Sequence, residues 1–132
     1  MPYERKHIEG GDEKSRKSEA LTAGYAIIAL LKGDYSADID IPAGGKKKIE
    51  VTHNENPTVE EAIDVAHKLS EHWTEVMMAY NNSPDYRDHQ LGIDVGHDMA
   101  MAPEVLISYL ATVPDKRTPL KEVMEKWMKE QW

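Results

Sequence analysis

NPTVEEAIDVAHKLSEHWTEVMMAY, residues 56–80, carries the clearest secondary-structure signal in this chain of 132 residues. Thr58 and Glu61 form a capping-box pattern directly after Pro57, which predicts that a helix begins here. Apolar residues then recur at helical spacing over about six turns. They are Val59, Ala62, Ile63, Ala66, Leu69, Trp73, Val76, Met77 and Tyr80. With charged residues opposite and the turn sequence NNSPD at its end, this segment predicts a long amphipathic helix with one face in the core.

A second helix is expected before it, in SRKSEALTAGYAIIALLKG at residues 15–33. Ser15 or Ser18 can act as the N-cap, and Gly33 stands where a C-terminal glycine belongs. The second half of the segment is apolar on every side, and a helix of this kind is normally buried all round. We expect it either at the centre of the fold or covered by another subunit.

Between these helices the hydrophobic period changes to two. In residues 35–41 Tyr35, Ala37, Ile39 and Ile41 alternate with polar residues, and in residues 48–53 Ile49, Val51 and His53 share a face. Gly44 and Gly45 provide the turn, so a β-hairpin is predicted over about residues 35–53. A lone two-stranded hairpin is only marginally stable. It must therefore lie on helices or pair its edges with another chain.

The C-terminal half predicts further helices. Gly92 and Gly96 each weaken a helix, so residues 86–101 are open between one helix, a broken helix and a loop. Pro103 suits the first turn of a helix that runs to about Val113, and Thr118 and Pro119 begin the last helix. The chain is thus predicted to be α+β and mostly helical, with four to five helices and one hairpin packed on them. Residues 1–14 are expected to form a flexible tail and residues 15–132 a single domain.

Composition narrows the functional classes. With 40% hydrophobic and 30% charged residues the chain is typical of a globular protein, and the absence of cysteine excludes disulfide, iron–sulfur and thiol chemistry. The longest apolar run, residues 23–31, is far shorter than the roughly 20 residues that span a bilayer. We expect an intracellular, cytoplasmic protein without a membrane segment. The net charge of −8 also argues against direct binding of nucleic acid.

Two segments contain residues that could hold a metal. SEHWTEVMMAY at residues 70–80 and VGHDMA at residues 95–100 resemble the first histidine helix and the His-Asp doublet of the HD phosphohydrolases. The resemblance implies that His72, His97 and Asp98 bind a divalent metal, which activates water on a phosphate ester.

Three departures favour a different interpretation. The only later aspartate, Asp115, lies in a proline-flanked turn and not on the later helix that the family needs. About 20 residues are predicted to form a hairpin, whereas the family is more completely helical. His72 also lies roughly 100° from the centre of the apolar stripe of its helix, at the border of that stripe. We therefore expect His97 and Asp98 to lie at an ordinary helix end, with no cofactor, and the sequence offers no other catalytic motif: it has neither a G-x-S-x-G nor a P-loop.

Acidic residues gather in and after the predicted hairpin. Eight carboxylates fall within 31 residues, beginning with Asp34, Asp38, Asp40 and Glu50. Such a cluster can meet a basic groove on a partner, as in an inhibitor that mimics nucleic acid. The lysines at residues 46–48 lie across the turn and would neutralise part of the negative charge of these carboxylates.

These features together favour a non-catalytic protein that acts through protein–protein contacts, as an accessory, assembly or inhibitor protein, and that binds its own copies as a homo-oligomer. The expected contact elements are Ile27, Leu30 and Leu31, the outer face of the hairpin with its four acidic residues, and the end of the last helix from Trp127 to Trp132. Tryptophan is favoured at interface hot spots, although Trp127 fits the apolar stripe of its helix and is expected in the core.

Overall fold

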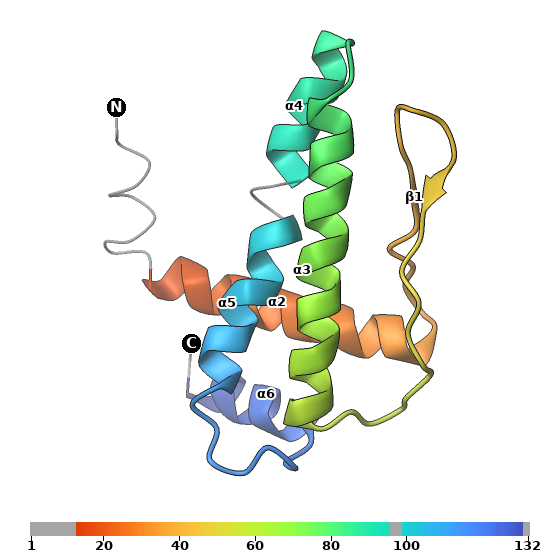
Figure 1. Cartoon of the computed structure of the whole chain (residues 1–132). Helices are drawn as coiled ribbons and strands as arrows, with labels where there is room; N and C mark the ends of the chain where they lie inside the picture. Colours follow the sequence, from red (N-terminus) through yellow and green to blue (C-terminus); the bar gives the residue numbers. More distant parts are fainter. Residues whose placement is uncertain (1–12, 96–98, 131–132) are drawn as a thin grey trace.

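The computed structural model describes residues 13–95 and 99–130, which form five helices and one small hairpin (Figure 1). The helices are α2 (Glu13–Lys32), α3 (Val59–Asn81), α4 (Tyr86–Val95), α5 (Met101–Leu110) and α6 (Leu120–Lys129). The strands are β1 (Ile39–Asp40) and β2 (Lys46–Lys47). The predicted fold class, mostly helical α+β with one hairpin, is confirmed. No helix in the described ranges combines the length and the apolar character needed to cross a bilayer.

Helix α3 begins at the predicted capping box. The Thr58 hydroxyl accepts a hydrogen bond from the Glu61 amide at 3.2 Å, and the Glu61 carboxylate accepts one from the Thr58 amide at 2.9 Å. The next free amides of the first turn, those of Val59 and Glu60, donate to the carbonyls of Thr118 and Lys116 at 2.8 and 2.9 Å. The start of α3 is therefore satisfied by its own cap and by the loop that precedes α6.

Helix α2 crosses α3 and α5 at the centre of the molecule (Figure 1). Of the two positions considered for this apolar helix, the central one is confirmed. Ile27, Leu30 and Leu31 are 0%, 7% and 3% exposed, so they lie in the core of their own chain. Their expected role as contacts to other chains is wrong, because all three are already buried within their own chain. The N-cap prediction is also wrong, since the helix includes both Ser15 and Ser18.

Two glycines have clear structural roles along α2. Gly33 ends the helix with φ of +88°, as the sequence predicts. Gly24 lies against α6, where an added Cβ would stand 2.6 Å from the sulfur of Met124. The nearest atoms are the sulfur and methyl group at the end of the Met124 side chain, so a larger residue at position 24 would require this flexible side chain to take another conformation.

The hairpin has the predicted turn but a shorter ladder than expected. Strands β1 and β2 pair antiparallel, with Ile39 opposite Lys47 and Asp40 opposite Lys46. Gly44 and Gly45 make the turn with φ of +99° and +87°. Outside the turn, the other residues of 35–53 belong to neither strand, and the Ile49 amide instead donates to the Asp38 carboxylate at 3.2 Å.

Residues 86–101, which the sequence left open between one helix, a broken helix and a loop, begin with helix α4. Helix α4 packs along the C-terminal half of α3, and residues 96–98 lie outside the described residues. Gly92 stands inside α4 and faces α3, where an added Cβ would lie 3.2 Å from the carbonyl oxygen of Met77 and would clash with the Asn81 side chain. The glycine therefore permits close helix packing rather than ending a helix.

The capping box of α3 should make the stability of the fold depend on pH. Hydrogen bonds from the Thr58 backbone and the Asn54 side chain hold the pKa of Glu61 below its ordinary value of 4.5. A carboxyl group with a lowered pKa stabilises the fold above its ordinary pKa, and this stabilisation is lost as the pH falls through the folded-state value. Glu61→Gln keeps the acceptor but does not titrate, so its loss of stability on acidification should be smaller than that of the wild type.

The measurement is urea unfolding at about pH 7 and about pH 3.5, where carboxylates of lowered pKa begin to protonate. The exposed neighbour Glu60 provides the control variant Glu60→Gln, which should keep the wild-type pH dependence. Equal acid sensitivity of Glu61→Gln and the wild type would contradict the assigned role.

Candidate functional site

His72, the first of the three residues of the metal interpretation, is buried between α3 and the hairpin. It is 4% exposed, its Nε2 donates to the Ala37 carbonyl at 2.7 Å, and its ring meets that of Trp73 edge-on at 4.8 Å between centroids. The sequence places His72 at the border of the apolar stripe, and the structure shows that this side of α3 is also buried, because the hairpin covers it. His97 and Asp98 lie outside the described residues.

The hydrogen bond to the Ala37 carbonyl determines which nitrogen of the His72 ring carries the proton. A carbonyl can only accept, so Nε2 carries a proton and the neutral ring keeps its lone pair on Nδ1. This Nδ1 atom is buried and meets no hydrogen-bond partner among residues 13–95 and 99–130. Within the same ranges, no three His, Asp or Glu side chains lie close enough to hold a metal ion together. For the described part of the chain, His72 thus serves to attach the hairpin to α3.

Further polar contacts run along the same interface. The Tyr80 hydroxyl donates to the Asp40 carbonyl at 2.9 Å, Lys47 pairs with Glu75, and the Lys68 amine reaches the Glu50 carbonyl at 3.5 Å. The residues of the last two contacts line an open groove of about 300 Å³ between α3 and residues 47–50. Because its charged walls neutralise each other across the groove, we assign it to hairpin attachment.

Loss of the His72 contact should release the hairpin without unfolding the core. His72→Ala leaves the Ala37 carbonyl without its donor in a residue that is 2% exposed, and an unsatisfied buried group costs about 1–3 kcal/mol. We expect faster amide hydrogen exchange over residues 35–50, with exchange in α2 changed far less. His67→Ala, at an exposed position on the same helix, is the matched control. Unchanged exchange in the hairpin would show that other contacts hold it.

The acidic residues expected to bind a partner have local partners of their own. The Asp34 carboxylate lies 3.9 Å from the Lys32 amine and that of Asp40 lies 3.8 Å from the Lys46 amine. The carboxylate of Asp38 accepts the Ile49 amide, as described above, while Glu50 is exposed. The outer face of the hairpin therefore carries mixed charge rather than a continuous acidic surface.

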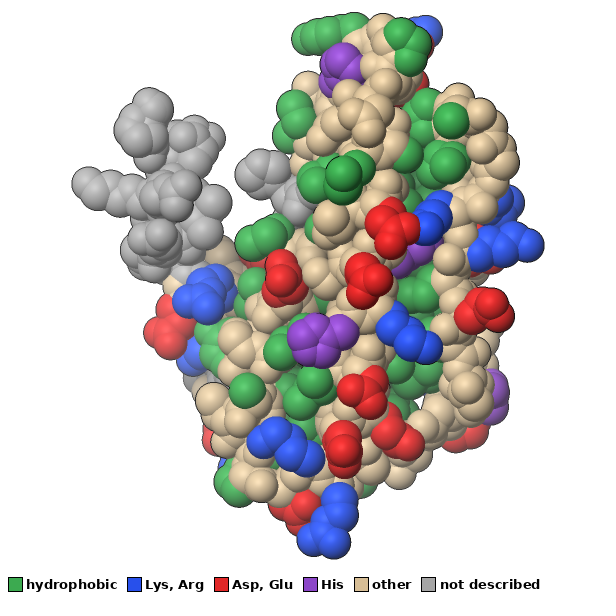
Figure 2. Space-filling model, viewed as in Figure 1, with side chains coloured by type: hydrophobic (Ala, Val, Ile, Leu, Met, Phe, Trp, Pro, Cys, Tyr) green, Lys and Arg blue, Asp and Glu red, His purple; other side chains and the backbone are tan. Residues whose placement is uncertain are grey.

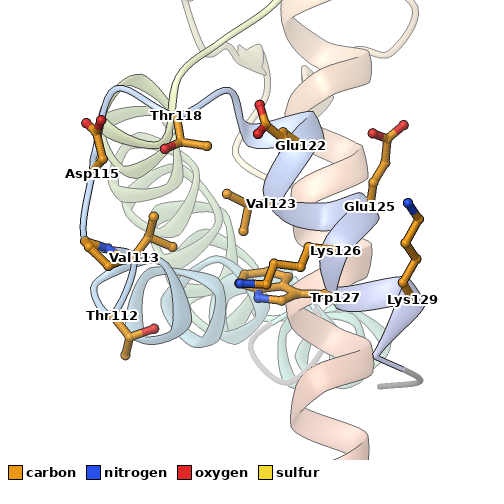
Figure 3. Close-up of a pocket in the computed structure, with 11 residues that line it drawn as sticks. Thr112, Val113, Asp115, Thr118, Glu122, Val123, Glu125, Lys126, Trp127 and Lys129 are labelled. Carbon is orange, nitrogen blue, oxygen red and sulfur yellow. The ribbon is translucent and has the colours of Figure 1, made fainter.

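Trp127 lies in the core, as its apolar stripe predicts. It is 8% exposed and meets the Tyr109 ring edge-on at 6.1 Å between centroids. Trp132 lies outside the described residues. Trp127 also lines a groove of about 590 Å³ between α6 and the loop before it (Figure 3). Carboxylates of Glu122 and Glu125 and amines of Lys126 and Lys129 line the same groove, and this mixture of charges selects no single class of ligand.

The most exposed apolar side chains of the described residues include three on α4, which the sequence interpretation missed. Tyr86, Leu91 and Ile93 are 79%, 48% and 51% exposed. Tyr86 and Ile93 lie about 20° apart around the helix, and we call these two residues the α4 surface, whereas Leu91 lies about 140° from Tyr86 on the other flank. Figure 2 shows hydrophobic side chains at the end of the molecule where α4 lies, beside a few basic and histidine side chains, while most of the charged side chains on this face lie further from that end. Tyr86 and Ile93 are seven residues apart, a spacing that puts them on the same side of a helix, but Gly92 and Gly96 made a helix here uncertain from sequence.

Comparison of the chain with protein-family models, with curated proteins and with solved structures found no match in any of the three.

Proposed function

We propose that this protein acts without catalysis, by binding other protein chains through the α4 surface. The observation that carries the proposal is the exposure of Tyr86 and Ile93 on one side of a helix of ten residues. Single exposed apolar side chains are ordinary, but two that share one side of a helix offer a contact site. The other large exposed apolar side chains of the described residues are spread over α2, α3, the opposite flank of α4, α5 and α6.

The way in which α4 is held supports this role. Its face around Gly92 packs closely against α3, and this close approach leaves the flanks of a short helix in solvent. The Ser83 hydroxyl donates to the Asp88 carboxylate at 2.6 Å, and the His89 Nε2 donates to the Ser83 carbonyl at 2.5 Å. These contacts fix the helix to the turn before it. The α4 surface is thereby ordered before binding, which lowers the entropic cost of association.

A tyrosine on this surface also fits the proposal. Tyrosine is enriched at interface hot spots because it buries a large rigid ring and keeps a polar end for hydrogen bonding. Tyr86 has the highest exposure among the large hydrophobic residues that the structure describes. Association therefore takes more apolar area from water at Tyr86 than at any other single side chain of the α4 surface.

Replacement of the α4 surface should remove binding and leave the fold intact. We expect Tyr86→Ser/Ile93→Ser, used as an immobilised bait in a lysate of cells that make the protein, to lose chains that the wild type retains. Because both side chains are at least half exposed, their loss should change the free energy of unfolding by about 0.5 kcal/mol or less. Quantitative mass spectrometry of the retained chains, untagged copies included, is the readout.

A matched control removes two exposed apolar side chains elsewhere. Met101 and Met128 are 49% and 54% exposed, and Met101→Ser/Met128→Ser should keep the wild-type set of retained chains. Equal losses in both double variants would point to nonspecific adhesion of apolar surface. An unchanged set for the α4 variant would refute the proposal.

A further inference from the structure

We infer that the chain which binds α4 is a second copy of this protein, with the two α4 helices packed antiparallel about a two-fold axis at Gln90. The inference rests on the proposed function and names its partner. It follows from the order of apolar and charged residues along the exposed side of α4, which is complementary to itself only when one helix is reversed.

The apolar residues are placed symmetrically about Gln90. At about 100° per residue, Tyr86, Gln90 and Ile93 fall within an arc of about 60°, on one side of the face that packs on α3. Tyr86 lies four residues before Gln90 and Ile93 three residues after it. A two-fold axis at Gln90 therefore sets each Tyr86 against Ile93 of the second copy and places two apolar pairs in the contact.

The charged residues follow the same symmetry with opposite signs. Arg87 and Asp94 lie about 20° apart around the helix, both on the same flank of the Tyr86–Ile93 side, three residues before and four after Gln90. A two-fold axis keeps equivalent flanks together, so each Arg87 meets Asp94 of the second copy. A parallel arrangement would instead set opposite flanks together, so that Arg87 and Asp94 of one copy would not meet Asp94 and Arg87 of the other.

Both charged side chains are available for this contact. The Arg87 side chain is 87% exposed, and its guanidinium donates to both carboxylate oxygens of Asp85 at 3.4 and 3.2 Å, a solvated pair that Arg87 can exchange for Asp94 of the second copy. The Asp94 carboxylate accepts a long hydrogen bond of 3.5 Å from Gln90. Neither bond is strong enough to keep these groups from a partner chain.

The size of the contact sets its strength. A helix of ten residues is about 15 Å long, so the contact buries less than the roughly 800 Å² per partner of a standard interface. We therefore expect a weak dimer that dissociates on dilution. Its concentration dependence can be followed by sedimentation equilibrium or light scattering from about 5 to about 500 µM, the range in which weak protein contacts dissociate.

Charge reversal tests the arrangement directly. Arg87→Asp sets two aspartates together in each half of the dimer, and Asp94→Arg sets two arginines together, so each single variant should dimerise at least about tenfold more weakly than the wild type. The double variant Arg87→Asp/Asp94→Arg restores opposite charges and should regain wild-type dimerisation. An equimolar mixture of the two single variants should form heterodimers, since position 87 of each chain then carries the charge opposite to that at position 94 of the other.

The outcomes separate the inference from the proposed function. A wild type that remains monomeric up to about 500 µM overturns the inference, as does a dimer that is insensitive to charge reversal or is not restored in the double variant. In either case, loss of other bound chains by Tyr86→Ser/Ile93→Ser would leave the proposed function standing. Equal thermal melting of the variants by circular dichroism confirms that the charge reversals act on association and not on folding.

Discussion

The first turn of α3 holds the interaction on which the rest of the fold depends. A helix start leaves its first amides without partners inside the helix, and here two different parts of the chain supply them. Thr58 and Glu61 provide the local cap, and the loop before α6 provides the carbonyls of Lys116 and Thr118. The Leu120 amide returns a hydrogen bond to the Pro57 carbonyl at 2.9 Å. This exchange fixes α6 beside the start of α3, and α6 in turn packs on α2 at Gly24.

The central position of α2 determines where partners can bind. This helix has apolar residues on nearly every side, and most of them are buried within the same chain, where α2 packs on α3, α5 and α6, while Tyr25 stays 47% exposed. The strongest hydrophobic segment is thus used for folding and is not free for contact with another subunit. What stays exposed is a helix at the edge of the molecule, α4, which is held by one close-packed face around Gly92. This division between a covered central helix and an exposed edge helix underlies the proposed function.

Much of the fold could be predicted from local signals, while the candidate site depended on tertiary contacts. The start of α3, the turn at Gly44 and Gly45 and the end of α2 at Gly33 follow from capping and from positive φ, which act over a few residues. The burial of His72 was not predicted, because a helical stripe accounts for one buried face, whereas the hairpin covers α3 on a second side. The α4 surface was missed because glycine has a low helix propensity, so Gly92 argued against a helix here. Its role in close packing against the Met77 carbonyl is visible only in the structure.

The most direct test of the account is amide hydrogen exchange of the wild-type protein at two concentrations, about 5 and about 500 µM, which bracket a weak association. If α4 carries the contact, exchange over residues 86–95 should slow at the higher concentration, while exchange in α6 and in the hairpin stays the same. Equal exchange in α4 at both concentrations would contradict the self-association. Protection that appears instead in another element would contradict the assignment of the contact surface to α4.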